Sequence, residues 1–170
     1  GKWWCYWCIY KCSMIILGID PGTSRTGYAV ISKTPTKIKA LCYGCWDLTG
    51  MESLEKLSVI SRNIAKLINE YGPKYLAIEK LFFFKNAKTV MSVSEARGVI
   101  IFTAYKKKVD ILELTPTEVK QNLIGYGRCG KKEVQKFVQL YLDLEEIPKP
   151  DDAADALAIC IASVVKKEKN

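Results

Sequence analysis

The feature that most constrains the fold is a continuous apolar run, Met14–Ile19, that stops at Asp20-Pro21-Gly22. An apolar run of this length closed by a turn is typical of a strand buried inside a sheet. Tyr75–Ile78 repeats the arrangement and ends at Glu79. The sequence therefore predicts two buried strands, each followed by an acid. If the strands are neighbours, both acids lie at the same end of the sheet.

The remaining periodicity predicts an α/β domain. Apolar positions between Met51 and Tyr71 recur at helical spacing and stop at Gly72-Pro73. We expect further strands over 26–32, 38–48 and 110–114, and helices over 87–106, from Thr115-Pro116, over 131–142 and over 151–166. Three antiparallel strands followed by alternating helix and strand give a mixed five-stranded sheet with helices on both faces. Residues 14–166 would form this domain, 1–13 an extension of unknown role, and 167–170 a disordered tail.

Composition limits the chemistry. The chain has 26 Lys and Arg against 18 Asp and Glu, a formal net charge of +8, which favours an acidic partner such as nucleic acid. Many basic domains are basic for solubility alone, but part of this excess is concentrated between residues 103 and 136. The chain has no His, so hydrolytic chemistry must use carboxylates, Lys, Tyr, Ser, Thr or Cys. No stretch approaches the roughly 18 apolar residues of a membrane span.

The seven cysteines do not predict a disulfide framework, because their number is odd and no secretion signal precedes them. Cys5-x-x-Cys8 and Cys42-x-x-Cys45 offer four thiolates that zinc would accept. The second pair falls in a predicted strand without the tight Gly turn of a zinc knuckle. Ordinary free thiols are therefore the favoured interpretation.

Three more acids open the last predicted helix. Asp151 suits the N-cap, whereas Asp155 lies a full turn inside, and Asp152 shares its helix face. Asp20 has two interpretations, a cap for the Pro-Gly turn or a ligand at the end of a strand. Carboxylates that converge without His would repel one another unless divalent cations neutralised them. Such oxygen ligands select Mg²⁺ or Mn²⁺.

Five stretches together resemble the RuvC family of Holliday junction resolvases, over essentially residues 14–165. They are GIDPGTSRTGYAVI at Gly18–Ile31, LAIEKLFFFKNAKTV at Leu76–Val90, SEARGVI at Ser94–Ile100, TPTEVKQNLIGYG at Thr115–Gly127 and DDAADALAICIA at Asp151–Ala162. Their order and spacing also fit. The extension over residues 1–13 has no counterpart in the family, and the loop that contains Cys129 and Gly130 differs among its members.

The resemblance assigns roles to particular residues. It implies that the catalytic, metal-binding acids are Asp20, Glu79, Asp152 and Asp155, with two Mg²⁺ per active site and Mn²⁺ as a substitute. Some members carry His where Asp152 stands. The junction-contacting aromatic falls on Phe82, with Phe83 and Phe84 as alternatives in the same run. The basic residues near the scissile phosphate fall on Lys120 and Lys131, and Lys132 shares the role of its neighbour.

The resemblance also implies a function. A ribonuclease H-like endonuclease would resolve four-way DNA junctions by paired symmetric nicks during homologous recombination and repair. It would act as a homodimer in the bacterial cytoplasm, at the nucleoid, beside a branch-migration motor of the RuvA and RuvB type. The alternatives are a junction-binding protein without catalysis, another ribonuclease H-like nuclease, and an actin-like ATPase lobe. The last needs a second lobe and a second phosphate loop, and this sequence shows neither.

Overall fold

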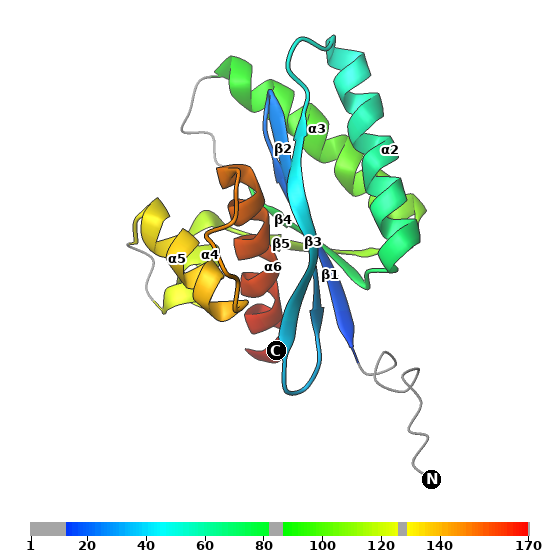
Figure 1. Ribbon diagram of the computed structural model, residues 1–170. Helices are drawn as coiled ribbons and strands as arrows, with labels where there is room; N and C mark the ends of the chain where they lie inside the picture. Colours follow the sequence, from blue (N-terminus) through cyan, green and yellow to red (C-terminus); the bar gives the residue numbers. More distant parts are fainter. Residues whose placement is uncertain (1–12, 82–86, 126–128, 170) are drawn as a thin grey trace.

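The computed structural model describes residues 13–81, 87–125 and 129–169. This part of the chain forms one mixed sheet with helices packed against it (Figure 1). In chain order the elements are β1 (Met14–Pro21), β2 (Arg25–Lys33), β3 (Ile38–Asp47), α2 (Ser53–Tyr71), β4 (Tyr75–Glu79), α3 (Ala87–Lys106), β5 (Asp110–Leu114), α4 (Pro116–Ile124), α5 (Lys131–Tyr141) and α6 (Asp151–Lys169).

The sheet has five strands in the order β3-β2-β1-β4-β5. β1, β2 and β3 form an antiparallel meander, and β4 and β5 join β1 in parallel. Ile19 of β1 pairs with Ile78 of β4, so Asp20 and Glu79 follow adjacent positions on neighbouring strands. The predicted neighbourhood of the two buried strands is confirmed.

Each face of the sheet has its own apolar core. Leu17, Ile19 and Ile78 pack with α2 and α3 on one face. Ile16 and Ala77 each precede one of these residues in the strand, and they pack with α4, α5 and α6 on the other face. Figure 1 shows these two layers of helices on opposite sides of the strands. Because side chains alternate along a strand, the Asp20 and Glu79 side chains fall on the α6 face.

Helix α6 lies unusually close to the meander. A methyl group added at Gly27 of β2 would overlap the carbonyl oxygen of Asp152, and one at Gly18 of β1 would overlap the Cys160 thiol. These two glycines let the helix approach the backbone of the sheet. Gly27 also pairs with Asp20 across β1 and β2. The first turn of α6 is therefore held beside the carboxyl end of β1.

Two predicted details were wrong. Helix α6 continues to Lys169, through residues that we expected to form a disordered tail. Lysines in its last turn suit the negative end of the helix dipole, and Lys169 also donates to the Asn122 side chain at 3.1 Å. Asp151 is not the N-cap, because it is the first residue of the helix. The carbonyl of Pro150, the residue before it, already accepts a hydrogen bond from the Ala153 amide. No helix within the described residues is long and apolar enough to cross a membrane.

Candidate active site

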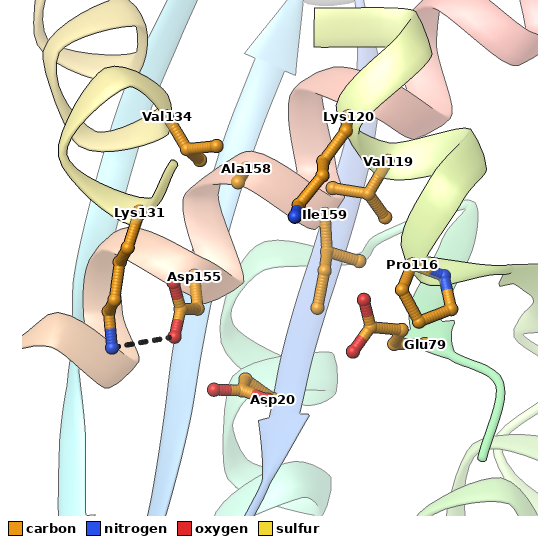
Figure 2. Close-up of a pocket in the computed structure, with 10 residues that line it drawn as sticks. All are labelled: Asp20, Glu79, Pro116, Val119, Lys120, Lys131, Val134, Asp155, Ala158 and Ile159. Atoms are coloured by element: carbon orange, nitrogen blue, oxygen red, sulfur yellow. Dashed lines mark ion pairs between the residues drawn. The ribbon is translucent and has the colours of Figure 1, made fainter. Parts of the chain in front are cut away.

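Three carboxylates from three different elements meet at one pocket. Asp20 comes from the end of β1, Glu79 from the end of β4, and Asp155 from the second turn of α6. The pocket has a volume of about 210 Å³. Figure 2 shows the three side chains directed toward a shared space between the strand ends and the helices. The sequence predicted this convergence from the two strand-end acids and the helix acid.

Two lysines and an apolar wall complete the pocket. Lys120 reaches it from α4, and Lys131 reaches it from the first turn of α5 (Figure 2). Both were predicted as basic residues of the site, and the structure places both beside the acids. The wall consists of Pro116, Val119, Val134, Ala158 and Ile159. Such a wall limits solvation of the charged groups and strengthens the interactions among them.

Asp20 has the most perturbed environment of the acids. Burial is the largest cause, because a carboxylate loses hydration inside the fold. Repulsion from the charges of Asp155 and Glu79 adds to it, and Lys131 opposes it. Together these effects raise the pKa of Asp20 to about 8. Without a further cation, this carboxyl group therefore carries a proton at neutral pH.

The two other pocket acids are perturbed in the same direction. Burial, and then the charge of Asp155, raise the pKa of Glu79, while Lys120 lowers it. Burial is also the largest cause that raises the pKa of Asp155, and Lys131 is the main opposing charge. With all three acids ionised, the pocket would hold more negative charge than its two lysines neutralise, and the proton on Asp20 removes this excess. Strongly perturbed acids in a cleft are typical of a functional site.

Lys131 links the pocket to an acid outside it. Its ammonium group lies 3.7 Å from a carboxylate oxygen of Asp155 and 3.1 Å from one of Asp151. Gln135 donates to the other Asp151 oxygen at 2.9 Å. The hydrogen bond that Lys131 donates to Asp151 is the main cause that raises the pKa of Lys131. Asp151, which does not line the pocket, therefore shares this lysine with Asp155, and the sequence did not predict this contact.

Of the remaining predicted site residues, the structure describes Asp152 and Lys132, and neither lines the pocket. Asp152 does not line it, and its carboxylate lies 3.9 Å from the Cys45 thiol of β3. The charge of Asp152 nevertheless contributes to the raised pKa of Asp20, so the two carboxylates are close enough to interact electrostatically. Lys132 is exposed to solvent. Phe82, with its alternatives Phe83 and Phe84, lies outside the described residues.

The donors of the pocket suit a hard divalent cation, since carboxylate oxygens are the ligands that Mg²⁺ and Mn²⁺ prefer. Within the described residues, no three Asp, Glu or Cys side chains lie close enough together to hold one ion as they stand. The zinc alternative loses support, because Cys42 contacts Tyr71 of α2 whereas Cys45 faces α6 on the other side of the sheet. One ion cannot use both thiols.

Arg97 of α3 was missed by the sequence reasoning. Its Nε donates to the main-chain carbonyl of Glu79 at 3.1 Å, and its terminal nitrogen forms an ion pair with Glu113. The side chain is mostly buried. The available signal was the one arginine of the helix predicted over 87–106, which lies shortly before the apolar run Val99–Phe102.

Comparison with known proteins identifies the family. Residues 16–163 match the family model described as crossover junction endodeoxyribonuclease RuvC. The chain belongs to this family. A curated RuvC from Halothermothrix orenii is 47% identical over 149 residues, which cover 87% of this chain and 90% of the relative. A RuvC from Fusobacterium nucleatum is 45% identical over 153 residues, with 89% and 80% covered.

The fold agrees with that of solved RuvC proteins. The structure of Thermus thermophilus RuvC gives a TM-score of 0.84 at 29% identity and covers 92% of this chain and 96% of the other. The same protein in complex with a Holliday junction substrate gives a TM-score of 0.84 at 26% identity, with 92% and 97% covered. The ribonuclease H-like fold expected for the RuvC family is thus confirmed, and the ATPase-lobe alternative is set aside.

Proposed function

We propose that this RuvC-family chain resolves four-way DNA junctions by metal-dependent hydrolysis, making paired symmetric nicks as a homodimer. The observation that carries the proposal is the pocket in which Asp20, Glu79 and Asp155 converge between two lysines. A family member that only bound junctions would not need three partly buried acids in one pocket. Their mutual repulsion is an unfavourable arrangement that a catalytic role explains.

The acids are the groups that would hold metal ions. Asp20, Glu79 and Asp155 supply carboxylate oxygens from the pocket, and Asp152 approaches it from the first turn of α6. Two bound Mg²⁺ or Mn²⁺ ions would activate a water molecule and stabilise the leaving oxygen of a phosphodiester. Before they bind, the proton on Asp20 and the ammonium group of Lys131 partly compensate the charge of the site.

The lysines are suited to bind the phosphate group. Lys120 is directed into the pocket from α4 on the side of Glu79, and Lys131 stands on the side of Asp155 (Figure 2). A scissile phosphate between them would meet one cation on each side. Because the ion pair of Lys131 with Asp151 is exposed, it is weak and easily exchanged for a phosphate. Lys132 would extend the basic surface along the DNA backbone.

A homodimer is supported by an exposed apolar stripe on α3. Met91, Phe102 and Tyr105 are 67%, 61% and 74% exposed, although large apolar side chains usually avoid water. Met91, Gly98 and Tyr105 are seven residues apart, and Phe102 follows Gly98 by one turn, so all four share one side of the helix. A second copy of the chain would cover this stripe, and Gly98 would allow close approach.

The wider setting follows from the family. We propose that the protein works in recombination and repair, in the cytoplasm at the nucleoid, beside a branch-migration motor of the RuvA and RuvB type. Phe82 remains the proposed contact to the bases at the junction centre, where an aromatic ring would replace stacking lost on opening the junction, worth roughly 1–3 kcal/mol.

The deciding experiment compares a synthetic four-way junction with a linear duplex of the same sequence, each with and without Mg²⁺. We expect paired cuts in opposing strands of the junction, only with metal, and little cleavage of the duplex. Tight junction binding without cleavage at any Mg²⁺ or Mn²⁺ concentration would instead identify a non-catalytic binder. Cleavage of an RNA–DNA hybrid in preference to the junction would identify another nuclease activity.

A further inference from the structure

Arg97 carries its charge in a mostly buried position. Its side chain is 14% exposed, within α3 on the face of the sheet opposite the pocket. A buried guanidinium group is costly unless it is hydrogen-bonded and paired with an opposite charge. Both conditions are met here, which indicates that Arg97 is held in one place rather than solvated.

The two partners of Arg97 belong to the ends of adjacent strands. Nε donates to the carbonyl of Glu79, the last residue of β4, and the terminal nitrogen pairs with the Glu113 carboxylate of β5. Glu113 lies opposite Ile78 in the β4–β5 register. The guanidinium group therefore links the main chain at the end of β4 to the Glu113 side chain of the next strand, β5.

Arg97 acts on Glu79 from behind the sheet. Leu112 and Leu114 pack against the α6 layer, so the side chain of Glu113 between them points toward α3. The Glu79 carboxylate lies on the other face, in the pocket with Lys120. Arg97 does not line that pocket. Its contact with Glu79 is made to the main chain, so it controls where the carboxylate is placed.

We propose that Arg97 is a positioning residue that fixes the Glu79 carboxylate for metal binding. The inference rests on the proposed role of Glu79 as a metal ligand. A strand end without this bond would let the carboxylate move relative to Asp20. Groups that orient metal ligands typically change metal affinity or activity by roughly 10- to 100-fold when they are removed.

The test measures metal binding apart from catalysis. Binding of Mn²⁺ to the metal-free protein is followed by electron paramagnetic resonance, for the parent, Arg97→Gln, Arg97→Lys and Glu113→Gln. Arg62→Gln, which changes an exposed arginine of α2, is the matched control. Glu79→Gln is included to test the proposed ligand itself. Junction cleavage over a range of Mg²⁺ concentrations is measured on the same proteins.

We expect Arg97→Gln to weaken Mn²⁺ binding by about 10-fold or more, and to raise the half-saturating Mg²⁺ concentration similarly, with cleavage recovering at high metal. Glu113→Gln should change both in the same direction, Arg97→Lys less, and Arg62→Gln not at all. The inference is overturned if Mn²⁺ affinity is unchanged, or if cleavage falls equally at every metal concentration in step with a lower melting temperature. If Glu79→Gln also leaves Mn²⁺ affinity and cleavage unchanged, the proposed function of the pocket fails instead.

Discussion

Asp20 makes the stability of the metal-free protein depend on pH. The pKa of its carboxyl group rises from an ordinary 3.8 to about 8 on folding. Between these values the folded protein holds a proton that the unfolded chain has released, so a higher pH favours unfolding. The stabilising contribution is complete below about pH 4 and is lost progressively as the pH rises to about 8. Asp20→Asn should remove this dependence.

The measurement is the free energy of unfolding in urea, with a chelator present, at several values between about pH 5 and pH 8. The free energy of unfolding of Asp20→Asn should increase relative to that of the parent as the pH rises. At the highest pH it should be larger by roughly 1–3 kcal/mol. Added Mg²⁺ should narrow the gap, because the cation stabilises only the ionised parent site. Parallel pH profiles for the two proteins would show that Asp20 titrates normally.

Asp155 tests catalysis at the same pocket. Asp155→Asn keeps the shape of the side chain but removes a charge that would hold metal, so junction cleavage should fall by at least about 100-fold. Binding of the junction without metal should change less than about threefold, because the phosphate contacts remain. Asp110→Asn is the control, because Asp110 is an exposed acid at the end of the sheet opposite the pocket, and this variant should retain most activity. Near-normal cleavage by Asp155→Asn would remove it from the catalytic set.

At this scale the sequence predicted the acids better than their surroundings. Asp20 and Glu79 could be placed because each ends an apolar strand, and Asp155 because it lies too deep in its helix to be a cap. The ion pair of Lys131 with Asp151 was not predictable, since the loop geometry that brings α5 to α6 has no local signal. Asp152 remains a prediction, because its carboxylate lies beside Cys45 rather than in the pocket wall.

The packing of α6 on β2 gives a prediction at the scale of elements. A methyl group at Gly27 would overlap the Asp152 carbonyl, and a main-chain atom cannot move aside as a flexible side chain can. Gly27→Ala should push the start of α6 away from β2, and should move Asp155 in the second turn away from Asp20. We expect a loss of about 1–3 kcal/mol in the free energy of unfolding, and slower cleavage than the lost stability explains.

Gly130→Ala is the control for this glycine, because its φ of −80° suits alanine and the added methyl meets only the end of the Glu133 side chain at 3.5 Å. Its unfolding free energy should change by less than about 1 kcal/mol. Thermal and urea unfolding of both variants, with cleavage assayed well below their melting temperatures, would check the expectation. A Gly27→Ala protein as stable and active as the parent would show that α6 tolerates the shift.

Most elements could be predicted because their signals are local. The apolar period, the Gly72-Pro73 stop and the Thr115 capping box all lie within the segments that they define, and the capping box is confirmed by the bonds between Thr115 and Glu118. The end of α6 was missed because contacts made by Lys166 and Lys169 with α4 stabilise its last turn. Such tertiary contacts override the weak local preference of a charged tail.

At the scale of the whole molecule, the order of the strands in the sheet brings the two strand-end acids together. Alternation of β and α segments predicted a parallel unit, but only the pairing of β1 with β4 places Asp20 beside Glu79. No local signal predicted the apolar stripe on α3, because that helix is apolar on several sides and periodicity does not show which side remains uncovered. Tertiary packing decides which side of α3 stays exposed, because the opposite side is covered by the rest of the fold.

The stripe on α3 leads to the last prediction, which concerns the assembly. Phe102→Glu would place a charge within the surface proposed to be covered by a second copy, and burial of an unpaired charge is costly. We expect the parent to have the mass of two chains by light scattering, and Phe102→Glu to weaken association by at least about 100-fold. Leu140→Glu is the control, because Leu140 is similarly exposed, at 67% against 61% for Phe102, but lies on α5.

The consequence for cleavage separates the dimer from the active site. The acids and lysines of the pocket all belong to one chain, so Phe102→Glu should still hydrolyse a single strand where it binds. On a cruciform plasmid, paired nicks within one binding event give linear DNA, whereas isolated nicks give relaxed circles. The variant should therefore shift the product from linear to relaxed, while Leu140→Glu should match the parent. A monomeric parent that still yields linear DNA would show that paired cutting does not depend on the α3 surface.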